Sequence, residues 1–151
     1  MDLSKRAKEI LGKIKYVTIA TSSNNEPWNS PVYSVHDDKY NFYWVSWREN
    51  KHSRNINENP NVFLVIYDST VPEGTGEGVY VRATAVEIQD KEEMEKALSL
   101  LYEGKAHKRG GEEFGGKYPR RIYKATPTEV WMNADGDVNG NYVDKRVEVK
   151  L

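Results

Sequence analysis

The sequence contains no cysteine. This absence excludes disulfide bonds, thiolate zinc sites, cysteine-held iron–sulfur clusters and a cysteine nucleophile. No apolar run approaches the ~18–20 residues of a membrane-spanning helix. Residues 1–15 alternate charged and aliphatic side chains, unlike the continuous apolar stretch of a signal peptide. We therefore expect a cytoplasmic protein that does not interact with a membrane.

An excess of charge of one sign is also missing. The 22 Lys and Arg residues are balanced by 23 Asp and Glu residues, which leaves a formal net charge of −1. This balance argues against a protein that neutralises phosphate backbones, so nucleic acid is not an expected partner. A small β-barrel that stacks single-stranded nucleic acid on aromatic residues is the least favoured hypothesis, because no continuous basic groove accompanies the aromatic residues.

Several motifs of catalysis and metal binding are absent. The sequence has no Gly-x-Ser-x-Gly motif, and its histidines are too far apart for a zinc-binding pair. The segment from Asp135 to Gly140 matches the first positions of a calcium-binding EF-hand loop. The position that should hold a bidentate glutamate is Arg146. We therefore interpret this segment as a hairpin turn and predict no metal site.

Short segments rich in β-branched and aromatic residues predict a protein made mainly of strands. Pro31 lies inside one segment and indicates an edge strand, a bulge or backbone groups left free for another partner, because proline cannot donate to a strand ladder. The continuous apolar run over residues 62–67 predicts a strand buried on both faces. The predicted strands cover residues 16–21, 28–36, 40–47, 62–67, 79–89, 122–126 and 129–132, with a final strand over 142–151.

Helices accompany these strands. Apolar residues recur at helical spacing in residues 3–14 and 94–101, and a short polar helix is predicted over 51–58. Residues 105–120 are rich in glycine and are expected to form a long loop, which at this length is typically functional or mobile or includes a short helix. Because the turns between strands are short, we expect antiparallel pairing and a closed or nearly closed barrel with peripheral helices. The length fits one domain over residues 1–151.

The segment from Trp28 to Arg54 contains the most informative group of residues. An aromatic strand ends there in a polar loop, and cations, a hydroxyl and free backbone N–H groups meet at the start of a helix, which suits a phosphate dianion. The aromatic residues suit a flat ring, and FMN requires a phosphate site beside a ring site. A solvated charged face explains the same residues equally well. The polar groups belong to Arg48, Lys51, His52, Ser53 and Arg54.

The order of these segments resembles the pyridoxamine 5′-phosphate oxidase-like family of FMN-binding split barrels, and within it the short members similar to general stress proteins. The resemblance spans roughly residues 3–132. Its most specific part is HSRNI, two further residues and NP, followed by an apolar strand. The segments that carry it are YVTIATSSNNEPWNSPVYSV, YNFYWVSWRENKHSRNINENPNVFLVIYD, GVYVRATAVEIQD and RIYKATPTEVW.

This resemblance implies a six-stranded antiparallel Greek-key split barrel that works as a homodimer, with FMN in a groove between the subunits. The second strand is expected to lie along the isoalloxazine ring. The end of the third strand and the start of the following helix are expected to hold the phosphate. The cofactor-binding residues predicted in this way are Ser30, Pro31, Val32, Tyr33, Val45, Ser46, Trp47, Lys51, His52 and Ser53.

The resemblance also implies an FMN-dependent oxidoreductase that acts on a small molecule. Because a flavin carries the redox chemistry itself, no catalytic side chain is predicted. Pyridoxamine phosphate oxidases are longer and hold their substrate with a C-terminal segment that contains Arg and His, so vitamin B6 phosphate is not the expected substrate. The alternative is a non-catalytic protein in which the same barrel binds, stores or senses flavin or haem. Both hypotheses share every sequence feature.

Overall fold

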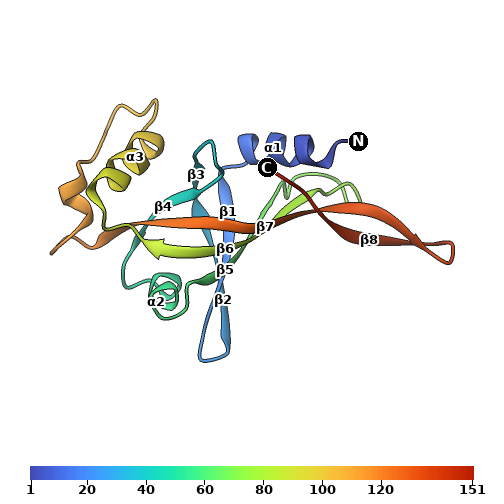
Figure 1. Cartoon of the computed structure of the whole chain (residues 1–151), viewed down its shortest axis with the longest axis horizontal. Helices are drawn as coiled ribbons and strands as arrows, with labels where there is room; N and C mark the ends of the chain where they lie inside the picture. The colour runs from blue at the N-terminus through green and yellow to red at the C-terminus, as the bar shows by residue number, and fades with distance from the viewer.

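The computed structural model describes residues 1–151 as one antiparallel sheet with helices at its periphery (Figure 1). The mainly β class predicted from the sequence is confirmed. The strands are β1 (Tyr16–Ser23), β2 (Glu26–Tyr33), β3 (Val35–His36), β4 (Phe42–Trp47), β5 (Asn61–Tyr67), β6 (Gly78–Glu87), β7 (Arg120–Val138) and β8 (Asn141–Glu148). The helices are α1 (Leu3–Lys13), α2 (Lys51–Glu58), α3 (Lys91–Leu101) and the short 3₁₀ helix η1 (Gly111–Phe114).

The strands follow the order β2-β1-β5-β6-β7-β4-β3, and β8 pairs with β7. The sheet therefore has eight strands, not the six that the resemblance implied. The additional strands have local causes: the second predicted strand breaks at Ser34 to leave the short β3, and β7 continues into a hairpin with β8. β2 also contacts β4, so the two ends of the sheet approach each other as in a nearly closed barrel.

The structure tests the predicted edge position of β2 and the predicted burial of β5. β2 is an edge strand, as Pro31 predicted, because it pairs with β1 alone. β5 is buried on one face only. Alternate residues from Val62 to Ile66 are buried, whereas Phe63 and Val65 between them are half-buried on the outer face of the sheet. The prediction of burial on both faces is therefore wrong.

β7 is one continuous strand where the sequence predicted two. It runs through Pro127, and the register against β6 shifts between Arg82 and Ala83. Ala83 pairs with Pro127 and Arg82 pairs with Glu129, which leaves Thr128 as an extra residue on β7. A bulge of this kind lets a strand accommodate proline, which has no N–H for the ladder. The strand therefore bends at Pro127 without ending there.

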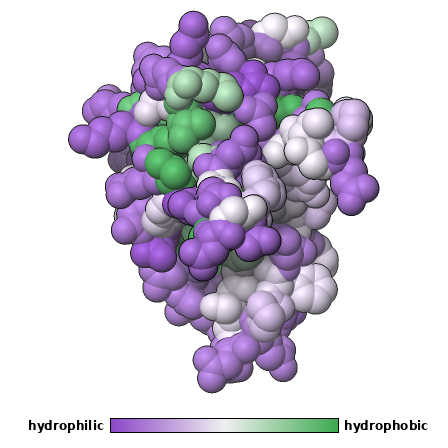
Figure 2. All heavy atoms as spheres, turned by 90° about the vertical axis from the view of Figure 1, so that its right-hand side faces the viewer, coloured by the Kyte–Doolittle hydropathy of each residue, from purple (hydrophilic) through white to green (hydrophobic).

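The segment that partly matches a calcium-binding loop forms the end of β7 and the hairpin turn that leads to β8, a turn that the sequence predicted. Asn139 and Gly140 have φ values of 54° and 78°, in the left-handed region that a two-residue hairpin turn requires. β8 ends at Glu148, before the predicted end at Leu151. The ribbon of β7 and β8 projects from the barrel (Figure 1), and the face of the molecule on this side is largely hydrophilic (Figure 2).

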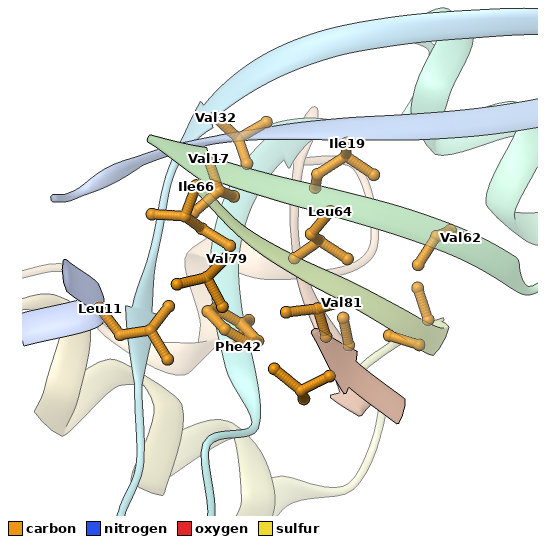
Figure 3. Packing of buried hydrophobic residues seen from close by; sticks show 14 of the residues in the cluster. Leu11, Val17, Ile19, Val32, Phe42, Val62, Leu64, Ile66, Val79 and Val81 are labelled. Atoms are coloured by element: carbon orange, nitrogen blue, oxygen red, sulfur yellow. The ribbon is translucent and has the colours of Figure 1, made fainter. Parts of the chain in front are cut away.

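The main hydrophobic core fills the inside of the barrel. Side chains from α1, β1, β2, β4, β5 and β6 point toward one another there (Figure 3). The helix α1 covers one end of this core with its apolar face. Its N-cap is Asp2, whose side chain accepts a hydrogen bond from the backbone N–H of Lys5. The labelled members of the core are Leu11, Val17, Ile19, Val32, Phe42, Val62, Leu64, Ile66, Val79 and Val81.

A second, smaller apolar cluster lies on the other face of β4, under α3 and η1. It contains Tyr43 of β4, Leu101 of α3 and Phe114 of η1, all of them buried. The predicted loop over residues 105–120 therefore includes a short helix that packs through Phe114. No helix of the structure has the length and apolar character needed to cross a membrane.

Candidate functional site

The residues predicted to bind a cofactor lie on β2, β4 and α2 or directly beside them (Figure 1). The helix α2 packs against β1 and β2, and its His52 side chain reaches both β2 and β4. Successive side chains of a strand point to opposite faces of the sheet. The structure therefore divides the predicted residues into an inner group and an outer group.

His52 is the centre of the inner group. Its side chain is buried, with 6% of the residue exposed. The Nδ1 atom lies 3.2 Å from Ser30 Oγ of β2, and the Nε2 atom lies 2.9 Å from Ser46 Oγ of β4. Trp28 Nε1 donates a further hydrogen bond to Ser30 Oγ over 3.0 Å. Val32, two residues after Ser30 on the same face of β2, belongs to the barrel core.

The outer group points away from His52. Pro31 and Tyr33 alternate with Ser30 and Val32 along β2 and are exposed. On β4, Trp47 is 50% exposed and Val45 is half-buried. The structure therefore does not place the ten predicted residues on one surface.

The start of α2 has donors without acceptors. The side chain of Asn50, the residue before the helix, makes no capping hydrogen bond. The backbone N–H groups of Lys51, His52 and Ser53 have no acceptor within the protein. Lys51 is half-buried and forms no ion pair, whereas the preceding Arg48 is paired with Glu49. A free helix N-terminus beside an unpaired lysine is an attractive place for an anion.

Ser53 contributes to this start of α2 through its backbone only. Its side chain is fully buried, and its hydroxyl has no hydrogen-bond partner. A ligand at the helix N-terminus would therefore meet the Ser53 N–H group. The predicted use of Ser53 as a phosphate ligand is compatible with the structure only in this form.

An open hollow of about 480 Å³ lies beside the end of β4. Sequence analysis did not identify Pro119 and Arg120 as part of the site, although Arg120 stands opposite Trp47 in the pairing of β4 with β7. Only the register of these distant strands brings them together, so no local motif could have revealed this contact. The residues that line the hollow are Val45, Ser46, Trp47, Asn50, Pro119 and Arg120.

Lys105 is a second neighbour of the site that the sequence did not identify. Its ammonium group lies 4.8 Å from the ring centre of Tyr33 and 5.6 Å from that of Tyr102. A cation over an aromatic face is attracted by the ring quadrupole. The loop after α3 therefore approaches the outer face of β2 at Tyr33. Its only sequence signal was the concentration of basic residues that begins at Lys105.

The protonation state of His52 follows from its burial. Desolvation disfavours the charged imidazolium and lowers the pKa of His52 below its usual value. The groups that contact the ring are serine hydroxyls rather than carboxylates. Burial therefore favours the neutral form of His52, and Lys51 is the cation that the helix N-terminus offers.

A family model described as pyridoxamine 5′-phosphate oxidase matches residues 3–134 of the chain. No curated protein matches the chain significantly. Many solved structures share its fold. The general stress protein 26 from Bacillus anthracis aligns with a TM-score of 0.63 and 15% identity, over 96% of this chain and 100% of that protein.

Two further solved structures have the same fold. The haem storage protein HutZ from Vibrio cholerae aligns with a TM-score of 0.68 and 19% identity, over 86% of this chain and 94% of that protein. An FAD-binding protein from Mesorhizobium loti aligns with a TM-score of 0.63 and 17% identity, over 85% of this chain and 92% of that protein. At these identities the likeness concerns the fold alone.

Proposed function

The chain belongs to the pyridoxamine 5′-phosphate oxidase family, and from this premise we propose that it is a flavoprotein that binds FMN at the site formed by β2, β4 and α2. The observation that carries this proposal is the start of α2. Three backbone N–H groups without acceptors lie there beside Lys51, a cation without a carboxylate partner. Charge-assisted hydrogen bonds of this kind suit a phosphate dianion.

The residues present fit the phosphate of FMN. Lys51 supplies a charge, and the N–H groups of Lys51, His52 and Ser53 supply donors from one turn of helix. The hydroxyls of Ser30 and Ser46 lie on either side of the His52 ring and add two further polar groups. None of these groups forms a hydrogen bond or an ion pair with a carboxylate.

The residues around β2 suit the ring of FMN. As an edge strand, β2 has backbone groups on its outer side that no neighbouring strand uses. These groups can serve the polar edge of an isoalloxazine ring, and the exposed aromatic rings of Tyr33 and Trp47 offer apolar contact nearby. FMN, when bound, supplies the redox chemistry. The protein supplies the binding and the orientation, which makes an oxidoreductase acting on a small molecule the proposed activity.

An absorbance spectrum of the purified protein tests this proposal most directly. A flavin spectrum, or quenching of FMN fluorescence on addition of the protein, is the expected result. Steady-state turnover with NAD(P)H and an electron acceptor then separates an enzyme from a protein that only binds the cofactor. A protein that is colourless and does not take up added FMN would contradict the proposed function.

Replacement of Lys51 by alanine is expected to weaken FMN binding by about 1.5–3 kcal/mol, because it removes one charge-assisted hydrogen bond to the phosphate. Fluorescence titration with FMN measures this change. Lys8→Ala is the matched control, because Lys8 is an exposed helical lysine on α1 without an ion pair. Equal affinities of the two variants would show that Lys51 does not contact the phosphate.

The proposal includes a homodimer with the cofactor between its subunits. The outer face of β5, β6 and β7 supports the formation of a dimer. There Phe63 stacks on Trp131 at 6.1 Å between ring centres, and the Arg82 guanidinium lies 5.4 Å from the Trp131 ring centre. These aromatic side chains are only half-buried in the single chain, and aromatic residues and arginine are enriched at protein interfaces.

Trp131→Glu is expected to convert the dimer to a monomer, since a carboxylate in the middle of this face would be buried by the partner without a counter-charge. Light scattering after size-exclusion chromatography measures the mass. The control is Tyr142→Glu, which changes a 68% exposed aromatic residue of β8. A wild-type protein that is monomeric at micromolar concentration would contradict the dimer.

A second candidate is a protein that binds or stores haem without catalysis. The solved structure of a haem storage protein with this fold favours it. His107 is exposed and makes no hydrogen bond in the structure, so its ring is free to bind a haem iron. Titration with haemin distinguishes the candidates: a Soret band that His107→Ala abolishes would support haem, whereas FMN uptake without such a band would support the flavoprotein.

A further inference from the structure

The buried hydrogen bonds around His52 form a directed chain. The indole N–H of Trp28 has only a proton to give, so Ser30 Oγ accepts from it. The hydroxyl proton of Ser30 is then available for His52 Nδ1, which lies 3.2 Å away. A neutral imidazole with its proton on Nε2 completes the chain by donating to Ser46 Oγ over 2.9 Å. When His52 is neutral, each of these three hydrogen bonds has one donor and one acceptor.

Protonation of His52 would reverse one link of this chain. An imidazolium has two N–H donors and no acceptor, so it donates to Ser30 from Nδ1 and to Ser46 from Nε2. Both serine oxygens then accept from His52, and both hydroxyl protons become free to point elsewhere. In the neutral form only the Ser46 hydroxyl proton is free. One added proton therefore creates a second free hydroxyl donor, that of Ser30, in contact with the His52 ring, together with a positive charge on that ring.

The charged groups near His52 do not compensate that charge. The neighbours on β2 and β4 are Trp28, Ser30 and Ser46, none of which is a carboxylate. On and before α2 the charged residues adjacent in the chain are Lys51 and Arg54 and the ion pair of Arg48 with Glu49. On β7 the buried cation Arg121 lies nearest Glu87 of β6. A protonated His52 therefore has no counter-ion in the protein itself, and an anion bound at the start of α2 would supply one.

We propose that anion binding at the start of α2 is linked to protonation of His52, so that the protein takes up one proton when it binds the phosphate of FMN. This inference rests on the proposed function and adds a regulatory property of the same site. Without ligand, burial lowers the pKa of His52. A bound dianion would raise that pKa, because an opposite charge nearby favours the charged form. By linkage, the affinity must then fall as the pH rises between the two pKa values.

Nuclear magnetic resonance of the histidine ring protons tests the first half of the inference. The chain has three histidines, and the variants His36→Gln and His107→Gln identify the remaining signal as that of His52. Without ligand His52 is expected to titrate below its reference pKa of about 6.5. With saturating FMN it is expected to titrate above that value. The same titration midpoint in both states would overturn the proposal.

Fluorescence titrations with FMN between about pH 5.5 and about pH 8.5 test the linkage itself. The phosphate of FMN loses its second proton near pH ~6, which changes the affinity independently of the protein. The variant His52→Gln records this ligand effect alone, because glutamine does not titrate, and His52→Lys keeps a permanent charge. Circular dichroism establishes that both variants are folded.

The affinity of the wild type is expected to approach that of His52→Lys at low pH and that of His52→Gln at high pH. The ratio of the FMN affinity of the wild type to that of His52→Gln should fall by up to about tenfold per pH unit between the two pKa values of His52. A slope of this size corresponds to the uptake of one proton. A constant ratio over this range would overturn the linkage while leaving FMN binding intact. A failure of every variant to bind FMN at any pH would instead contradict the proposed function, and this inference with it.

Discussion

Replacement of Trp44 by alanine is expected to lower the free energy of unfolding by about 3–5 kcal/mol. Trp44 of β4 is completely buried in the barrel core. Its ring stacks on that of Tyr123 on β7, with 5.7 Å between the ring centres and an angle of 17° between the planes. Truncation removes a large apolar contact and leaves a cavity that strands on both sides can fill only in part. Urea denaturation followed by circular dichroism measures the loss.

Two further variants show whether burial is the cause. Trp47→Ala removes the same side chain from a position that is 50% exposed on the same strand. The decrease in the free energy of unfolding should therefore be far smaller for this variant. Trp44→Phe keeps an aromatic ring and removes an indole N–H that has no hydrogen-bond partner. Because an unsatisfied buried donor is unfavourable, this variant should also lose much less than Trp44→Ala. Similar losses at positions 44 and 47 would contradict the packing described for β4.

Replacement of Asp37 by alanine is expected to cost about 3–5 kcal/mol of stability. Asp37 lies in the turn between β3 and β4, and 6% of the residue is exposed. Its carboxylate accepts hydrogen bonds from the Asn41 side chain, from the Tyr43 hydroxyl at 3.1 Å and from the Lys96 ammonium of α3 at 2.8 Å. Backbone N–H groups of Lys39 and Asn41 also donate to it. Removal of the carboxylate would leave these donors without an acceptor.

The same contacts make this contribution depend on pH. Burial alone would raise the pKa of Asp37, but the hydrogen bonds from Asn41, Lys96 and Tyr43 outweigh it and hold the pKa well below its usual range. In the unfolded chain an aspartate titrates near pH ~3.9. The unfolded state therefore binds the proton first, and the stabilisation is complete above that pH and declines as the pH falls below it.

Unfolding free energies of the wild type and Asp37→Asn at about pH 7 and about pH 3 measure this dependence. The wild type should lose more stability on acidification than Asp37→Asn, which has no carboxyl group to protonate. The matched control is Lys96→Met, which removes only the exposed partner of the ion pair and is expected to be milder than Asp37→Ala. An equal acid response of the wild type and Asp37→Asn would refute this role of Asp37.

Much of the fold was predictable because its signals are local. The β-branched segments that became β1 and β6 and the helical spacing of α1 and α3 depend on neighbours within a few residues. The edge position of β2 was also predictable, since Pro31 cannot donate to a strand ladder. Predictions failed where a distant strand decides the outcome. The bulge that carries β7 through Pro127 depends on its pairing with Arg82 and Ala83 of β6.

The candidate site also combines features that are local in the sequence with features that depend on distant strands. The sequence by itself determined that hydroxyls, cations and a helix start follow an aromatic strand, because these groups are close along the chain. Only the tertiary structure decided that the ring of His52 turns inward between Ser30 and Ser46, and that Arg120 and Lys105 approach Trp47 and Tyr33. The physical reason is that strand register and helix packing, which join residues far apart in the chain, select the side chains that meet.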